Sequence, residues 1–248
     1  MQEFNFPNWV NRFFYVALAT VVIVGGYLAT CLFFATHPDT VNRGHRPLQP
    51  VPFSHKLHAG ELKMDCRYCH NTVEQAGHAA IPPTATCGNC HGGNRTVEGR
   101  ALAVVQQESP LLAPVRESLE VTLAGNQDSE KASIGWLRVH DLPDFVYFNH
   151  SAHINRGVSC VSCHGRVDQM QVVQQAKNLS MRFCLDCHRA PEQHLRDPQL
   201  VTQLDFQIDE EHPQVVDGVT FTDQDEYGRF WMEKLHVTPN ESCSTCHR

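Results

Sequence analysis

The string Cys-x-x-Cys-His occurs five times in the 248 residues of this chain, and it constrains the possible fold more than any other feature. The copies use ten of the eleven cysteines: Cys66, Cys69, Cys87, Cys90, Cys160, Cys163, Cys184, Cys187, Cys243 and Cys246. This spacing is the attachment signature of haem c, in which two thiols bond to the porphyrin and the histidine becomes the proximal iron ligand. We therefore predict five covalent haem c groups, bound on the proximal side by His70, His91, His164, His188 and His247.

Two other kinds of site use closely spaced cysteines. Zinc ribbons contain Cys-x-x-Cys pairs, but they need no histidine directly after the second cysteine. Disulfides form between such cysteines in an oxidising compartment, but they leave the five histidines unexplained. The haem interpretation accounts for both residue types in every copy, and we prefer it.

Hydrophobic residues make up 42% of the chain, and many of them lie in one N-terminal run instead of a globular core. Five porphyrins would supply the apolar core that the side chains do not. We predict a mainly α fold with much irregular loop: a haem-packed multihaem cytochrome c domain on a single N-terminal transmembrane helix. The chain without haem is expected to fold poorly, because cofactor binding free energy is then folding free energy. A net charge of −7 argues against a nucleic-acid partner.

The N-terminal run extends from Phe13 to Thr36 without a formal charge. Its length suits a hydrocarbon core of about 30 Å, and Trp9 and Arg12 before it suit an interfacial anchor. A cleaved signal peptide is the main alternative, but its apolar region is usually only about 7–15 residues long. A lipoprotein cleavage box ending at Cys31 fits less well, because threonine precedes the cysteine. We predict a retained helix in the cytoplasmic membrane.

The haem motifs predict the orientation of this anchor, because bacteria attach haem c on the outer side of the cytoplasmic membrane. The haem domain would therefore be periplasmic. We divide the chain into a cytoplasmic N-terminus (1–12), a transmembrane helix (13–36), a linker (37–52), a first dihaem unit (53–92), an insert (93–147), a second dihaem unit (148–190) and an acidic C-terminal segment with the fifth haem (191–248).

An internal repeat precedes the two pairs of closely spaced haem motifs. Phe-x-His-x-x-His occurs once with His55 and His58, and again with His150 and His153. Histidines at positions i and i+3 lie on one side of a helical turn, where they can serve two different irons. We predict that these four histidines are distal haem ligands. The alternative is that they are surface histidines or belong to another kind of metal site.

Four distal histidines leave one iron without a sixth ligand. Met181 is the first candidate, because it stands three residues before Cys184 and a methionine ligand would raise the potential of its haem. The alternative is that Met181 only packs against a porphyrin. The remaining candidates are His140, which ranks next, and Met170, His78, His194, His212 and His236.

Two other segments give weaker indications. Leu119 to Leu123 alternates like a short strand. Residues 199–234 contain nine acidic residues against one Arg and one Lys. This acidic segment is either a solvated face or a docking surface for a basic partner such as a soluble cytochrome c.

The repeated histidine units resemble class III multihaem cytochromes c. A closer resemblance lies in the block VHDLPDFVYFNHSAH (139–153), in CHGRVDQM (163–170) and in the ending ESCSTCHR (241–248). With the anchor and five haem motifs, these blocks are similar to the pentahaem cytochrome subunit of alternative complex III, a bacterial quinol:acceptor oxidoreductase. The resemblance extends over essentially the whole chain.

This resemblance implies an electron carrier without a catalytic residue of its own. Its partners would be an integral membrane quinol-oxidising subunit, an iron–sulfur subunit, another cytochrome c subunit and, as acceptor, a soluble cytochrome c or a terminal oxidase. One alternative is an anchored multihaem quinol dehydrogenase that feeds a periplasmic reductase. A multihaem enzyme is a further alternative, but it needs an open iron position, often marked by Cys-x-x-Cys-Lys, and all five motifs here end in histidine.

Overall fold

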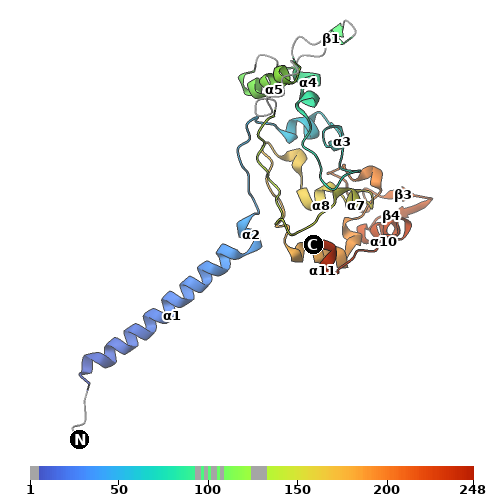
Figure 1. Cartoon of the computed structure of the whole chain (residues 1–248). Coiled ribbons are helices and arrows are strands. Elements are labelled where there is room, and N and C mark those ends of the chain that lie inside the picture. The colour runs from blue at the N-terminus through green and yellow to red at the C-terminus, as the bar shows by residue number, and fades with distance from the viewer. Residues whose placement is uncertain (1–5, 93–95, 98–99, 102–104, 107–108, 124–132) are drawn as a thin grey trace. The chain divides into compact units, whose positions relative to one another are not determined.

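The computed structural model describes residues 6–92, 96–97, 100–101, 105–106, 109–123 and 133–248 (Figure 1). The chain divides into two compact units, Met1–Arg43 and Gly44–Arg248. The first unit contains α1 (Asn8–Thr36) and α2 (Pro38–Val41). The second unit contains the five haem motifs.

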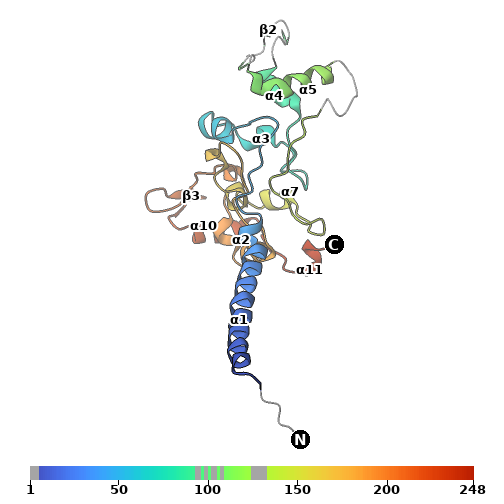
Figure 2. The ribbon, with the colours of Figure 1, turned by 90° about the vertical axis from the view of Figure 1, so that its left-hand side faces the viewer.

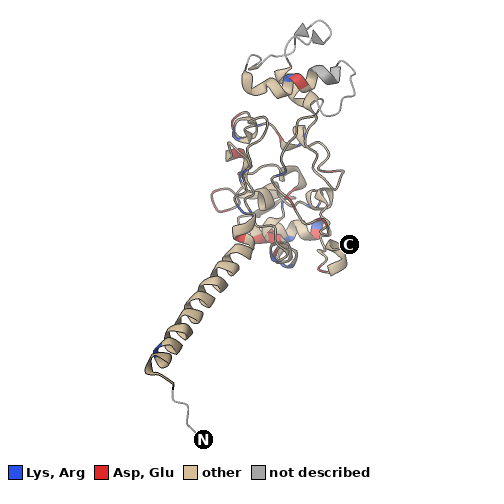
Figure 3. Cartoon of the chain, turned by 60° about the vertical axis from the view of Figure 1, so that its left-hand side comes forward, with Lys and Arg blue, Asp and Glu red and all other residues tan. Residues whose placement is uncertain are grey.

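Helix α1 is apolar along nearly its whole length, with a mean hydropathy of 2.2 in its most apolar window. Figure 3 shows charge on it only near its start, where Arg12 lies. The hydroxyls of Thr20 and Thr30 each donate to a carbonyl four residues earlier at 2.8 Å, which satisfies these polar groups within the helix. Within the described part of the chain, one helix, α1, is long and apolar enough to cross a membrane.

Short helices and irregular loops make up most of the second unit, which confirms the predicted mainly helical, loop-rich class (Figure 2). The helices are η1 (Lys56–Glu61, a π-helix), α3 (Cys66–Cys69), α4 (Thr84–His91), η2 (Pro110–Leu112), α5 (Ala113–Leu123), α7 (His150–Ile154), α8 (Cys160–His164), η3 (Val167–Gln169), α9 (Met181–Arg189), η4 (Pro191–His194), η5 (Pro198–Leu200), α10 (Gln224–Lys234) and α11 (Cys243–Cys246).

Two small antiparallel hairpins complete the second unit. One pairs β1 (Thr96–Val97) with β2 (Arg100–Ala101). The other pairs β3 (Gln214–Val216) with β4 (Val219–Phe221), joined by Asp217 and Gly218. Both joining residues have positive φ (52° and 82°), which is the backbone of a type I′ hairpin turn and explains the Asp-Gly sequence.

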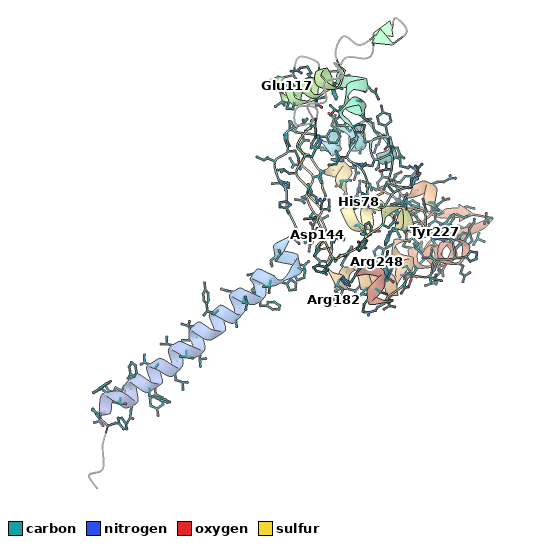
Figure 4. All side chains as sticks on the ribbon, viewed as in Figure 1. His78, Glu117, Asp144, Arg182, Tyr227 and Arg248 are labelled. Carbon is teal, nitrogen blue, oxygen red and sulfur yellow. The ribbon has the colours of Figure 1, made fainter. Side chains whose placement is uncertain are left out.

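The side-chain core of the second unit is small and divided into three clusters. The largest consists of Leu195, Phe221, Tyr227 and Trp231, around α10. The other two are Val51, Val115 and Leu119, and Val73, Ile154 and Val201. Tyr227, labelled in Figure 4, is fully buried. A core of this size for a unit of Gly44–Arg248 agrees with the expectation that side chains alone supply little apolar interior.

The predicted strand at Leu119–Leu123 is wrong, because these residues form the last turns of α5. Val115 and Leu119 are buried one helical turn apart and pack on Val51. A spacing of four residues places both side chains on one face of a helix. The alternation that suggested a strand was too short to outweigh this helical pattern.

Candidate haem-binding sites

Three of the haem motifs lie in helices with a side-chain cap at the N-terminus. Asp65 caps α3 by accepting a hydrogen bond from the backbone of Arg67, Ser159 caps α8, and Ser180 caps α9. Ser, Thr, Asp and Asn are the preferred residues at this position, because their side chains satisfy a free backbone N–H. The caps of α3 and α8 come directly before the first cysteine of the motif, whereas Ser180 comes four residues before Cys184. In each helix the two cysteines lie three residues apart on one turn, and the histidine follows directly.

The described cysteines are not paired in the structure. All eleven are free thiols in the structure. Among the described residues, no three His, Cys, Asp or Glu side chains converge as ligands of one metal ion. Burial raises the pKa of the Cys160 thiol to about 12, with Cys66 as the next cause.

Three proximal histidines place Nδ1 against a backbone carbonyl oxygen. The distances are 2.9 Å from His70 to Ala80, 2.7 Å from His91 to Val105, and 2.9 Å from His188 to Asn240. A carbonyl oxygen only accepts, so Nδ1 must carry the ring proton. The lone pair of Nε2 is then free, and this is the tautomer that a metal-binding histidine needs.

The two Phe-x-His-x-x-His units have nearly the same ring geometry. Phe53 stacks on His58 with centroids 4.3 Å apart, and Phe148 stacks on His153 at 4.5 Å. Each phenylalanine also meets the first histidine of its unit edge-on at 4.8 Å. The sequence repeat therefore corresponds to a repeated arrangement of side chains, although the first unit forms a π-helical turn and the second an α-helical one.

The histidines of these units also direct Nε2 away from the backbone. Nδ1 of His58 lies 2.9 Å from the carbonyl of Ser54, that of His150 lies 3.0 Å from Gly77, and that of His153 lies 2.7 Å from Asn149. These three rings are therefore in the same tautomer as the proximal histidines above.

His55 differs from the other histidines of the two repeat units. Its Nδ1 is buried without a hydrogen-bond partner. Burial, followed by the nearby His70 and His58, lowers the pKa of His55 to about 4. The ring is therefore neutral at physiological pH, as ligation of a metal requires.

Three distal candidates face a proximal histidine. The ring centroids are 6.2 Å apart for His58 and His91, and 6.2 Å apart for His153 and His188. They are 6.4 Å apart for His150 and His164, whose rings are nearly parallel at 13°. Two imidazoles on opposite sides of one metal ion place their centroids about 6 Å apart, because each metal–nitrogen bond is about 2 Å long. The spacing of all three pairs therefore fits a six-coordinate iron.

Among the described residues, neither His70 of the first motif nor His247 of the fifth faces a distal candidate at this spacing. The Phe145 ring stacks on His247 with centroids 5.8 Å apart, and the Tyr147 N–H donates to the Cys246 carbonyl at 2.7 Å. Met181 lies in the first turn of α9 with 68% of its surface exposed. Its own helix contains Cys184, which has Cys246 of the fifth motif as an electrostatic neighbour.

The other candidates for a sixth ligand lie elsewhere. His140 contacts the proximal His164 itself, with 3.3 Å between Nε2 and Nδ1. His212 pairs with Asp209 at 2.9 Å, and His194 lies 3.2 Å from the Ser162 hydroxyl. His78 and His236 are exposed, and Met170 is half-buried beside η3. The contact between His140 and His164 could not be predicted from the sequence, because the two residues are 24 positions apart and are brought together only by the fold.

Contacts between motifs place the second motif beside the first and the first beside the third. The Asn89 amide of the second motif donates to the Tyr68 hydroxyl of the first at 3.1 Å. Asp65, which caps the first motif, accepts from Thr202 at 2.9 Å. The neighbouring Val201 carbonyl in turn accepts from the Cys160 N–H of the third motif at 3.1 Å.

The third motif adjoins the fourth, and the fourth adjoins the fifth. Burial, followed by the nearby thiols of Cys187 and Cys184, raises the pKa of the Cys163 thiol to about 11. Both of these neighbouring cysteines belong to the fourth motif, which therefore lies beside the third. Arg189, directly after the fourth motif, pairs with Glu241 before the fifth at 2.9 Å. The motifs are therefore arranged in space in the order second, first, third, fourth, fifth, which differs from their order in the sequence.

Comparison with known proteins supports the haem interpretation. Residues 51–109 match the family described as cytochrome c7 and related cytochrome c. The multihaem cytochrome c subunit of menaquinone reductase from Nitratidesulfovibrio vulgaris is 32% identical over 119 residues. These residues are 47% of this chain and 45% of the relative, so the chain spans about half the length of the curated relative it matches. Both matches are with cytochromes c, which supports the predicted multihaem cytochrome c domain.

Proposed function

We propose that this cytochrome c7-like chain carries five covalent haem c groups and relays electrons in a membrane quinol:electron-acceptor oxidoreductase of the alternative complex III type. The ten motif cysteines would attach the haems, and His70, His91, His164, His188 and His247 would be the proximal ligands. The distal ligands would be His55, His58, His150, His153 and Met181.

One observation carries this proposal: three separate pairs of imidazoles face each other at 6.2, 6.2 and 6.4 Å. Solvated histidines have no physical reason to adopt one spacing three times. By analogy between the repeat units, His55 would pair with His70, since His70 is its main electrostatic neighbour. Met181 is then left for the iron of His247, in line with the neighbouring positions of Cys184 and Cys246.

Bound haem supplies a one-electron iron couple whose potential depends on axial ligands, burial and nearby charge. The protein fixes the orientation of each imidazole through hydrogen bonds of Nδ1 to carbonyls. Two axial ligands at each iron leave no coordination position for a substrate. The chain is therefore proposed as an electron carrier without a catalytic residue, and its partners perform the quinol chemistry.

The arrangement of the motifs suggests the route of a conduction path. Each motif contacts the next in the spatial order second, first, third, fourth, fifth. The second and fifth motifs are the two ends of this series, so electrons would enter at one of them and leave at the other. The partners would be a quinol-oxidising membrane subunit, an iron–sulfur subunit, another cytochrome c subunit, and a soluble cytochrome c or terminal oxidase.

Helix α1 is proposed as a single transmembrane anchor in the cytoplasmic membrane, with the haem unit on the periplasmic side. Its length, its apolar composition and its internally bonded threonine hydroxyls support this assignment. Haem c attachment outside the cytoplasm supplies the orientation.

A second function is favoured by the relative from Nitratidesulfovibrio vulgaris, which is a subunit of menaquinone reductase. In that case the chain would carry electrons toward a quinone instead of away from a quinol. The haem relay is the same in both cases, and the partners and the direction differ. An anchored quinol dehydrogenase that feeds a periplasmic reductase stays a third possibility of the same type.

The proposal is tested on the native complex. The chain is purified from its own membranes, its haem content is measured by mass and by the pyridine haemochrome spectrum, and reduction of the haems by added quinol is followed. Five haems per chain and rapid reduction by quinol support the proposal. Fewer than five covalent haems, or recovery with a soluble reductase and no membrane subunit, would contradict it. Reoxidation by quinone alone would favour the second function.

A further inference from the structure

The imidazole rings of His140 and His164 are in edge-to-face contact. Nε2 of His140 lies 3.3 Å from Nδ1 of His164, and the ring planes are inclined at 77° with centroids 4.4 Å apart. Both rings are half-buried. In this T-shaped arrangement Nε2 of His140 points at Nδ1 of His164, as a hydrogen bond between the two rings requires.

The roles of the two nitrogens follow from the other sites. In His70, His91 and His188, Nδ1 donates to a backbone carbonyl and Nε2 is left for iron. If His164 binds iron in the same way, its Nδ1 carries the proton and must donate. Nε2 of His140 is then the acceptor, so the ring proton of His140 lies on Nδ1.

We infer that His140 is a positioning residue for the third haem site, where its Nε2 accepts the hydrogen bond that fixes the tautomer and orientation of the proximal His164. This inference rests on the proposed function for its haem. An acceptor on the outer nitrogen makes a ligating imidazole a stronger electron donor. A stronger donor stabilises ferric iron, so His140 also lowers the potential of this haem.

The third site is the suitable place to test this effect. At the first, second and fourth sites the acceptor is a backbone carbonyl, which no substitution removes. At the third site the acceptor is a side chain that belongs to no haem motif. The third motif also lies in the middle of the spatial series of motifs, so its potential affects transfer between the first and the fourth.

The experiment compares His140→Phe, which keeps a planar ring but removes the acceptor, with His140→Gln, which keeps an acceptor oxygen. His212→Phe is the control, since His212 pairs with Asp209 outside the haem motifs. The full-length holoprotein is titrated electrochemically while optical and electron paramagnetic resonance spectra are recorded. His150→Met marks the component of the third site, because a methionine ligand raises the potential.

We expect His140→Phe to move this one component to a more positive potential and to change its low-spin ferric signal, while His140→Gln restores both and His212→Phe changes neither. Unchanged potentials and signals in His140→Phe would overturn the inference. A new high-spin signal would also overturn it, because His140 would then be an axial ligand itself. Loss of one haem from the phenylalanine variant but not from the glutamine variant supports the acceptor role, whereas loss from both overturns it. Haem content of the wild-type chain tests the proposed function separately.

Discussion

The imidazole rings of His153 and His188 face each other with their centroids 6.2 Å apart, although they come from different helices, α7 and α9. If both bind one iron, His153→Ala converts one of the five proposed haems from a low-spin to a high-spin state, because one axial ligand is lost. Electron paramagnetic resonance of the oxidised protein measures this conversion. His78→Ala is the matched control, since His78 (labelled in Figure 4) is exposed and lies outside the repeat units. A high-spin signal in the His78 variant but not in the His153 variant would refute this pairing.

Met181 is predicted to be the sixth ligand at the site of His247. Met181→Leu keeps the apolar side chain but removes the sulfur, so the near-infrared magnetic dichroism band of histidine–methionine ligation should disappear. The effect should be confined to one of the five proposed haems. Met170→Leu is the control and should leave the band intact. A band that survives in the Met181 variant and vanishes in the Met170 variant would reassign the ligand.

Gly228 is predicted to be essential for packing between α10 and η4. A Cβ atom at this position would lie 1.8 Å from the Glu192 carbonyl oxygen, which belongs to the backbone of η4. Gly228→Ala should therefore lower the free energy of unfolding by about 1–3 kcal/mol, in spite of the better helix propensity of alanine. Denaturant unfolding of the holoprotein measures this change. Gly135→Ala meets open space and should change stability by no more than about 0.5 kcal/mol. Equal effects of the two substitutions would contradict the prediction.

Asp65 is predicted to contribute stability that depends on pH. Its hydrogen bonds with the Arg67 side chain, and further bonds from the Arg67 backbone and Thr202, lower its pKa from 3.8 to about 2. A carboxylate with a lowered folded-state pKa stabilises above its unfolded pKa, and this contribution is lost as the pH falls from about 4 to about 2. Asp65→Asn should therefore be less stable than the wild type at pH 7, by about 1 kcal/mol or less because the group is partly exposed.

The difference between the wild type and Asp65→Asn should shrink as the pH approaches 2. Unfolding by denaturant at a series of pH values measures it. Asp144→Asn serves as the control, since Asp144 lies outside this hydrogen-bonded group (Figure 4). A difference between Asp65→Asn and the wild type that stays constant down to pH 2 would show that the charge of Asp65 contributes nothing.

The haem motifs, the long apolar helix and the histidine repeat could all be predicted from the sequence because they are local patterns. A Cys-x-x-Cys-His string has its meaning within five residues, and the apolar run from Phe13 to Thr36 lies within α1. The strand predicted at Leu119–Leu123 failed for the opposite reason. Its helical state depends on packing of Leu119 against Val51, a contact far along the chain.

By itself, the sequence determined how many attachment motifs the chain has and which residue types each motif offers to a haem. The tertiary structure decided which imidazoles face each other, such as His58 and His91, and which motifs are neighbours. It also decided that Nε2 of His140 meets Nδ1 of His164, which comes from a segment 24 residues further along the chain. The physical reason is that covalent attachment needs only neighbouring residues, whereas axial pairing and motif order depend on loops that bring distant segments together at fixed distances.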